Sequence, residues 1–409
     1  MNQHTVLHHP GLSRRGLLGG MLGLAFASAL PRCGVARGLT VDAGAFGAVG
    51  DGRADATAAL NAAARAVPAG GVLHVPPGRY RITHPVLLHT GTTLAGPGAT
   101  LFATEAWQSP HPGRDRTKRW KVMVANLNHA AADIQDHDIT VRDIHFQYVG
   151  TQDGEAHAVE FRMARKIVVD SCSFSGGGNA TAFLACRETE VVRCISQGTL
   201  NCAFDHWEGT SDGLVHQCVA TCARGYGILF TGAGTEKAHH AHAARLSAIG
   251  NRIYTPSAAG IWICSLSEES VVSEVVVRDN LVRGGPFKAA GIGATGRVRD
   301  ILIENNRIED VKGHGALFSR PDKWGRPSGV RILRNRIARC TVDDAAIALI
   351  QALGDGIEVR GNRALASDFP SLAWVDGRDV VLADNGGSQM RGKHKYRMER
   401  AITPMISDP

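Results

Sequence analysis

A short pattern recurs along this chain of 409 residues and constrains its fold more than any other feature. Alternating β-branched and other apolar residues lead each time to one position that holds Asn, Cys or Ile. We call these the ladder positions: Ile144, Cys172, Cys194, Cys218, Asn251, Asn280, Asn306, Asn335, Asn362 and Asn385. Neighbouring ladder positions are 22 to 33 residues apart. Since the spacing varies while the pattern persists, the repeat predicts stacked coils whose loops differ in length.

A second pattern lies between the ladder positions and reads small residue, apolar, variable, apolar. It begins at Ala158, Ala182, Ala203, Gly227, Gly260, Gly291, Gly315, Ala346 and Ser371. Each repeat therefore holds at least two short strands, which favours an all-β fold, a single-stranded parallel β-helix of about ten or more coils. In such a fold the aligned asparagines are structural, because they satisfy backbone groups at the bends.

Composition excludes several classes of protein. Hydrophobic residues make up 44% of the chain and charged residues 20%, which excludes a mostly disordered chain. The 48 glycines show no three-residue period, so collagen is excluded too. The net charge is +7, and it falls to about +3 without residues 1–37, which carry four arginines and no acidic residue. A mildly basic chain fits an acidic polymer as its partner, whereas no basic stripe interleaved with aromatics indicates nucleic acid.

The N-terminus predicts export. Arg14 and Arg15 precede an apolar, Gly- and Ala-rich stretch that ends at Leu30. Residues 1–30 resemble a bacterial twin-arginine signal peptide, and an ordinary secretory signal is the alternative. The protein is therefore expected to be periplasmic or secreted, with no stable insertion into the membrane. Because this route carries folded proteins out of a reducing compartment, the nine cysteines are expected as buried thiols rather than as disulfides.

The chain divides into further predicted segments. Residues 38–100 form an N-terminal cap and the first coils, with a capping helix that starts after Asp55. Residues 101–128 form a basic loop with two tryptophans, residues 129–389 form the coils, and residues 390–409 form a basic tail.

Two stretches in the cap resemble a known family. They run from Asp42 to Thr57 (DAGAFGAVGDGRADAT) and from Gly70 to Tyr80 (GGVLHVPPGRY). Both look like the opening of pectate-lyase-superfamily proteins of the rhamnogalacturonase/epimerase-like group. The resemblance implies a right-handed parallel β-helix that acts on, or binds, a polysaccharide. These motifs make turns, so they indicate the fold and leave the chemistry open.

The repeat also predicts one candidate site. When the small residue is numbered zero, positions one and three point inward and positions two and four outward. Position two then holds Glu160, Leu184, Asp205, Leu229, Trp262 and Gly293, and position four holds Arg162, Cys186, Trp207, Thr231, Cys264 and Thr295. The candidate catalytic residues are Asp205, Glu160, Glu208, His206, Arg187 and Tyr226, and the candidate substrate-binding residues are Trp207, Trp262 and Arg162.

These residues admit more than one chemistry. Glu160 and Asp205 are expected two coils apart, roughly 9–10 Å, a separation that suits an inverting glycoside hydrolase. Alternatively, an acidic residue with Ca²⁺ neutralises a uronate, and Arg187 or Tyr226 removes a proton in β-elimination. Two surface ion pairs, Glu160–Arg162 and Arg187–Glu208, are the structural alternative. His206 falls at an inward position, and only a shift of one residue would bring it beside Asp205.

A second-rank cluster lies further along the chain. It consists of His314, Asp344, Lys288 and Arg320. Gly313-His314-Gly315 and Asp343-Asp344 resemble motifs of polygalacturonases, but in reversed order. The tract Glu236–His242 contains three histidines without the spacing of a metal site, which favours a solvated loop.

Three functions follow as hypotheses. The first is an exported enzyme that cleaves or remodels an acidic polysaccharide, by β-elimination or hydrolysis. The second is a non-catalytic glycan-binding or surface-structure protein, and the third is a polyuronate C5-epimerase. No cofactor is certain, Ca²⁺ is the one candidate, and the sequence leaves the metal ligands and the oligomeric state unknown.

Overall fold

The computed structural model describes residues 39–107, 121–150, 156–222, 224–233, 242–254, 256–284, 290–313, 316–342, 348–368, 371–388, 394–398 and 405–407. The chain divides into two units, residues 1–38 and 39–409, and all described residues lie in the second. The predicted export signal and the prediction for Glu236–His242 (apart from His242 itself) therefore fall outside the described residues.

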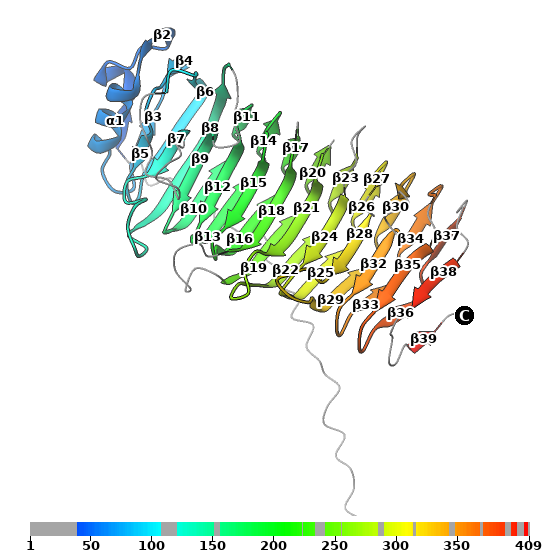
Figure 1. The fold of residues 1–409 in the computed structure, drawn as a ribbon. Coiled ribbons are helices and arrows are strands. Elements are labelled where there is room, and N and C mark those ends of the chain that lie inside the picture. Colours follow the sequence, from blue (N-terminus) through cyan, green and yellow to red (C-terminus); the bar gives the residue numbers. More distant parts are fainter. Residues whose placement is uncertain are drawn as a thin grey trace, which may run out of the picture. The chain divides into compact units, whose positions relative to one another are not determined.

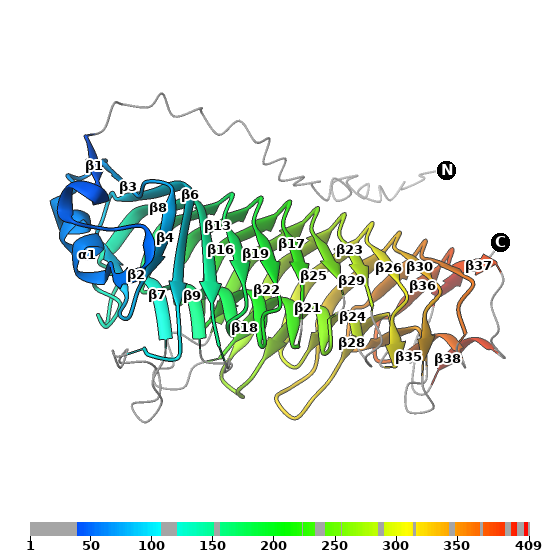
Figure 2. The ribbon, with the colours of Figure 1, turned by 90° about the horizontal axis from the view of Figure 1, so that it is seen from above.

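Parallel strands stack rung upon rung in two main sheets (Figures 1 and 2). The first sheet has twelve strands, one from each successive coil. They are β5 (Val86–Leu88), β7 (Lys121–Asn126), β9 (Ala156–Arg162), β12 (Asn179–Leu184), β15 (Cys202–Trp207), β18 (Tyr226–Gly232), β21 (Ala259–Ser265), β24 (Ala290–Thr295), β28 (Leu317–Arg320), β32 (Ile350–Leu353), β35 (Ser371–Asp376) and β38 (His394–Met398).

The second sheet has twenty-five strands in two rows, joined where β6 and β8 run through both. One row and the cap consist of β1 (Thr40–Asp42), β2 (Asp51–Asp55), β3 (Val72–His74), β4 (Gly78–Arg81), β6 (Thr93–Ala103), β8 (Asp136–Tyr148), β10 (Ala164–Asp170), β13 (Arg187–Val192), β16 (Ser211–His216), β19 (His242–Ile249), β22 (Val271–Arg278), β25 (Val298–Glu304), β29 (Ser328–Leu333), β33 (Glu358–Arg360), β36 (Val381–Ala383) and β39 (Met405–Ser407). The row of short strands consists of β11 (Ser173–Ser175), β14 (Ile195–Gln197), β17 (Val219–Thr221), β20 (Arg252–Tyr254), β23 (Leu281–Arg283), β26 (Arg307–Glu309), β30 (Arg336–Ala338), β34 (Arg363–Leu365) and β37 (Gly386–Ser388). A small separate sheet pairs β27 (Lys312–Gly313) with β31 (Thr341–Val342).

The predicted all-β, right-handed parallel β-helix is confirmed. Every strand pairing in the described part of the coils is parallel, and each coil adds a rung to both sheets. The inward side chains of all rows form one continuous apolar core, in which Phe161, Phe183, Phe204 and Phe230 lie at successive rungs of the twelve-stranded sheet.

The ladder positions occupy the bend between the two rows of the large sheet. At each asparagine position, from Asn251 to Asn385, the side-chain oxygen accepts the backbone N–H of the ladder residue before it, as Asn335 Oδ1 does from Asn306 N at 2.9 Å. The amide nitrogen donates to a carbonyl in an earlier coil, as Asn335 Nδ2 does to Ile303 O at 3.0 Å. Cys218 N donates to Asn251 Oδ1 at 3.0 Å, which joins the cysteine positions to the asparagines. The prediction that these asparagines are structural is confirmed.

The cap contains a short 3-10 helix, η1 (Ala43–Phe46), and the helix α1 (Thr57–Ala66), which packs on the open end of the first coils (Figure 1). The helix begins one residue later than the pattern predicts. Asp55 still binds its first turn, because its Oδ1 accepts from Thr57 N at 3.0 Å. Leu60, Ala63 and Ala64 of this helix are buried, and the helix covers the edge of the sheet.

Two segments predicted as a loop and a tail carry strands. β6 and β7 enter the range 101–128 from either side, so only residues 108–120 of the basic loop lie outside the described residues. β38 and β39 lie in the range 390–409. The eight described cysteines are buried and unpaired by disulfides, as predicted. Within the described ranges, no helix combines the length and the apolar character that a membrane crossing needs.

Candidate functional site

The outer face of the twelve-stranded sheet gathers most of the predicted site residues. Its register places Glu160, Ala182, Asp205, Leu229, Trp262, Gly293 and Phe318 side by side in one column. A neighbouring column holds His157, Asn179, Cys202, Tyr226, Ala259 and Ala290. The two columns are three residues apart along the strand, yet His157 and Glu160 contact each other through their side chains.

Glu160 forms a buried pair with a histidine that the pattern did not single out. The distance from His157 Nδ1 to Glu160 Oε2 is 2.7 Å, and both side chains are almost fully buried. Tyr148 Oη donates to His157 O at 2.8 Å, which fixes the backbone of this histidine. The two side chains are therefore within hydrogen-bond distance of each other.

Asp205 accepts a hydrogen bond from an amide side chain. Asn179 Nδ2 donates to Asp205 Oδ2 at 3.1 Å, and Asn179 Oδ1 accepts from Cys202 N at 3.0 Å. The second bond fixes the orientation of the amide, so that its NH₂ group faces the carboxylate. The two carboxylates of the site thus have different surroundings.

Glu160 and Asp205 lie two rungs apart, as predicted, with Ala182 between them. Two rungs correspond to about 9–10 Å between the backbones. Ala182 carries only a methyl group at the intervening position, so no side chain of that column separates the two carboxyl groups.

An ion pair borders this face at the ends of the strands. Arg162 Nη2 lies 3.6 Å from Glu208 Oε2, with the side chains 17% and 11% exposed. The sequence predicted the ion pairs Glu160–Arg162 and Arg187–Glu208 as the structural alternative. In the structure Arg162 pairs with Glu208 instead. Trp207 is half-buried at the end of β15, in line with Arg162.

Aromatic rings continue the face beyond Asp205. Trp262 lies between Tyr226 and Phe318, with ring centroids 5.9 Å and 5.0 Å away. Phe318 lies across Gly293, where an added Cβ would be 2.0 Å from the ring, so only glycine permits this packing. The Arg320 guanidinium lies 5.2 Å from the Phe318 centroid. Burial raises the pKa of Tyr226, and the neighbouring Cys264 and Cys202 thiols raise it further, so its phenol is protonated at neutral pH.

Two predicted catalytic residues lie elsewhere. His206 is fully buried in the core between Phe183 and Phe230, and its Nε2 lies 3.1 Å from Thr189 Oγ1. Burial lowers the pKa of His206 to about 3, so it is not a base of the outer face. Arg187 is exposed on β13 of the other sheet. Neither belongs to the candidate site.

The predicted register was wrong in four coils, where the pattern starts at Ala180, Ala316, Leu349 and Leu372 instead of Ala182, Gly315, Ala346 and Ser371. Ala180, not Ala182, matches Ala158 and Ala203, so Leu184 lies in line with Arg162 and Trp207, and Cys186 lies outside the strand. Further along, Ala316 rather than Gly315 matches Gly291, which turns Phe318 outward. Of the second-rank cluster, Arg320 lies on the aromatic end of the face, whereas His314, Asp344 and Lys288 lie outside the described residues.

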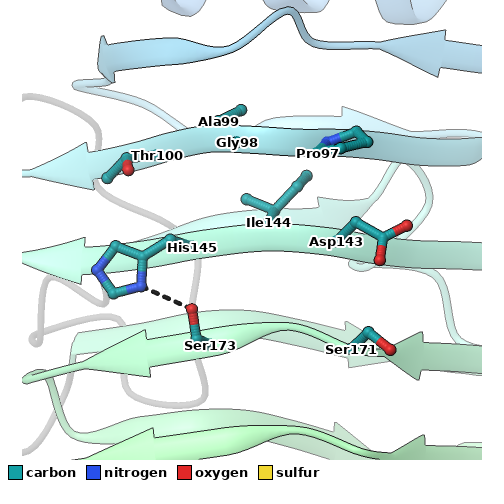
Figure 3. A pocket seen from close by; sticks show the side chains of 9 residues that line it. All are labelled: Pro97, Gly98, Ala99, Thr100, Asp143, Ile144, His145, Ser171 and Ser173. Atoms are coloured by element: carbon teal, nitrogen blue, oxygen red, sulfur yellow. Dashed lines mark hydrogen bonds between the residues drawn. The ribbon is translucent and has the colours of Figure 1, made fainter.

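A shallow pocket of about 390 Å³ lies on the other sheet (Figure 3). It is lined by residues of β6, β8 and β11, and His145 Nδ1 lies 2.8 Å from Ser173 Oγ within it. Burial, and then the charge of Arg79, lower the pKa of His145. Because this pocket is formed by the twenty-five-stranded sheet, it is separate from the candidate site.

Among the described residues, no group of three or more His, Cys, Asp or Glu side chains gathers in the way that a metal ion needs. Glu160 and Asp205 contribute one carboxylate each, two rungs apart. A Ca²⁺ ion takes six to eight oxygen ligands, so these two residues alone do not fit it.

The fold and the functional face define a parallel β-helix of the pectate-lyase type. The family model described as "Rhamnogalacturonase A/epimerase, pectate lyase-like" matches residues 41–316, and the chain belongs to that family. A search of the curated proteins by sequence finds no match.

Solved structures with a similar fold have several functions. A family 28 exopolygalacturonase of Yersinia enterocolitica is 12% identical, with a TM-score of 0.70 over 91% of this chain and 79% of its own. The A-module of a mannuronan C-5 epimerase of Azotobacter vinelandii is 15% identical, with a TM-score of 0.64 over 90% of this chain and 100% of its own. A surface adhesin of Streptococcus pneumoniae is 13% identical, with a TM-score of 0.64 over 90% and 92%. Likenesses at these identities establish the fold alone.

Proposed function

We propose that this protein is a polysaccharide-cleaving enzyme, a glycoside hydrolase whose two carboxylates are Glu160 and Asp205. The observation that carries the proposal is their placement in one outward column, two rungs apart across Ala182. Inverting hydrolases need two carboxyl groups about 6.5–9.5 Å apart, so that a water molecule fits between one of them and the sugar. Side chains that lean toward each other from about 9–10 Å reach that range.

The different partners assign the two roles. Asn179 Nδ2 donates to Asp205 Oδ2 and holds this carboxyl group in place, so we assign to Asp205 the role of the base that takes a proton from water. His157 Nδ1 lies 2.7 Å from Glu160 Oε2 and can pass a proton to it, so we assign to Glu160 the role of the acid that protonates the leaving oxygen. The water oxygen bonds to the anomeric carbon, the glycosidic bond breaks, and the new reducing end has inverted configuration.

The substrate is proposed to be an acidic polysaccharide. Arg320 lies beside the aromatic end of the face and supplies a cation for a uronate carboxylate. Tyr226 and Trp262 are half-buried, and such rings bind the apolar faces of sugars. The family description and the fold of the exopolygalacturonase agree with this class of substrate. The twin-arginine pattern of residues 1–30 supports a periplasmic or secreted location, where such a polymer is met.

The test is an assay of uronate-containing polymers for new reducing ends, with NMR to read the configuration of the product. Glu160→Gln and Asp205→Asn should each lower kcat about 100-fold or more. Glu358→Gln, which removes a half-buried carboxylate of β33 on the other sheet, is the matched control and should keep full activity. Full activity in Asp205→Asn would refute the assignment.

Other products would point to other reactions. An unsaturated sugar with its ultraviolet absorbance would indicate β-elimination, and altered uronate stereochemistry at unchanged length would indicate a C5-epimerase. The raised pKa of Tyr226 speaks against this tyrosine as the base for either reaction. Loss of activity with EDTA, restored by Ca²⁺, would show that residues beyond Glu160 and Asp205 hold a metal ion.

One observation favours a second function, that of a non-catalytic glycan-binding protein. Glu160 is 1% exposed and Asp205 is fully buried, whereas Tyr226, Leu229 and Trp262 on the same face are partly exposed. Binding of a polymer that stays intact, lost in Trp262→Ala and kept in Asp205→Asn, would support this function over hydrolysis.

A further inference from the structure

A stripe of arginines lies on the row of short strands, away from the candidate site. The register aligns Arg252, Leu281, Arg307, Arg336, Arg363 and Gly386 on successive rungs of β20, β23, β26, β30, β34 and β37. We call its four arginines the arginine stripe. All four are exposed, and three of them follow one another without a break. Figure 1 shows β26, β30 and β34 as successive strands along this row.

Like charges on neighbouring rungs repel one another. The rungs of a sheet lie about 4.8 Å apart, and like charges directly opposite each other destabilise a strand pair. Arg336 lies between Arg307 and Arg363, so it meets this repulsion from both sides.

Carboxylates neutralise only part of the stripe. Arg307 binds Glu309, a fully buried residue whose carboxylate also accepts from Arg283 and Arg339. Arg363 donates to a backbone carbonyl, that of Asp384, at 2.7 Å. Among the described residues, no carboxylate lies within ion-pair distance of Arg252, Arg336 or Arg363. Arg336 and Arg363 therefore present exposed guanidinium groups on neighbouring rungs, and Arg252 presents another three rungs before Arg336.

We propose that the arginine stripe is a second binding surface, which holds a linear anionic polysaccharide along the axis of the coils. A chain of uronates offers one carboxylate per sugar, and a sugar unit spans about one rung. Guanidinium groups bind carboxylates in a bidentate manner, which point charges do not.

A nucleic acid fits the same stripe less well. A single strand of DNA in a duplex has a phosphate every 3.4 Å or so, closer than the rungs. Proteins that bind single strands also offer aromatic rings for stacking, and Tyr254 is the one aromatic residue among the described residues of these short strands from β20 to β37. The stripe lies on a different sheet from Glu160 and Asp205, so the proposal stands whether or not those residues are catalytic.

The test measures binding of polygalacturonate by the full-length protein at low salt. The double variant Arg336→Gln/Arg363→Gln should raise the dissociation constant at least 10-fold and make its dependence on salt shallower. The control, Arg299→Gln/Arg331→Gln, removes the same charge from exposed positions on β25 and β29, where no arginine is aligned on the neighbouring rung. It should change the constant less than 2-fold.

Short oligosaccharides and DNA complete the test. A trisaccharide is too short to span both surfaces. The double variant and the wild type should therefore bind or cleave it equally at the Glu160–Asp205 face, and this result separates the proposal from the proposed catalytic function. Equal losses in the two double variants would show an effect of net charge alone and overturn the proposal. Tighter binding of single-stranded DNA than of polygalacturonate would overturn it as well. Thermal melting of each variant establishes that it is folded.

Discussion

Asn306 in the middle of the ladder offers a sharp test of what holds the coils together. Its Oδ1 accepts from Asn280 N at 3.0 Å and from Asn280 Nδ2 at 2.9 Å. Its Nδ2 donates to Val277 O at 2.9 Å and to Asn335 Oδ1 at 3.0 Å. Asn306→Ala removes all four bonds at a site that is 1% exposed.

The magnitude follows from the groups that lose their partner. Asn280 N–H and Val277 C=O are backbone groups that lose the Asn306 amide as a partner. A buried polar group left without a partner costs about 1–3 kcal/mol, so two such groups cost about 2–6 kcal/mol. The alanine also leaves a small cavity, which adds to the loss.

Asn305 supplies the matched control, one residue away. It is exposed, its φ is 52°, and its side chain donates only to Asp279. Asn305→Gly keeps the left-handed backbone and should change stability by about 1 kcal/mol or less. Urea unfolding followed by circular dichroism, with hydrogen exchange at Asn280 N–H, measures both variants. Equal stabilities of Asn306→Ala and Asn305→Gly would refute the structural role of the ladder.

Two further predictions concern the core and the aromatic end of the face. Since burial lowers the pKa of His206 to about 3, below its usual 6.5, the unfolded chain binds its proton first and stability falls as the pH drops below about 6.5. In the variant His206→Leu, the free energy of unfolding should fall less between pH 6.5 and pH 5 than in the wild type, by about 1.4 kcal/mol per pH unit. The same pH dependence in both proteins would contradict the prediction. Gly293→Ala should destabilise by about 1–3 kcal/mol and shift tryptophan fluorescence, because the new Cβ overlaps Phe318. Gly386→Ala, whose Cβ would meet only Arg363 at 3.4 Å, should have little effect, and equal effects of the two would show that the Phe318 packing is not as described.

The fold could be predicted because it rests on a pattern that repeats. Every coil carries the same ladder position and the same apolar alternation. An error of register in one coil therefore does not change the fold that the other coils predict. The capping helix was also predictable from its alanines and Asp55, to within one residue. The strands β38 and β39 were not, since a basic tail carries no apolar alternation that distinguishes a last coil from a solvated end.

The site was predicted only in part, because it depends on register and on side-chain partners. Glu160 and Asp205 were correctly predicted to share a column because the register was right at Ala158 and Ala203, whereas the error of one residue at Gly315 hid Phe318. His157 and Asn179 were missed because simple alternation turns them inward, whereas in the structure their side chains contact Glu160 and Asp205. The spacing of three residues from His157 to Glu160 and from Asn179 to Ala182 is the signal that could have shown it.

The central claim is that the outer face of the twelve-stranded sheet binds and cleaves a polysaccharide. A crystal structure of the inactive variant Asp205→Asn with a uronate oligosaccharide tests it most directly. We predict that the sugar chain lies across Tyr226 and Trp262, with a glycosidic oxygen within hydrogen-bond distance of Glu160. An oligosaccharide bound only at the arginine stripe, with none on the twelve-stranded sheet, would contradict the claim.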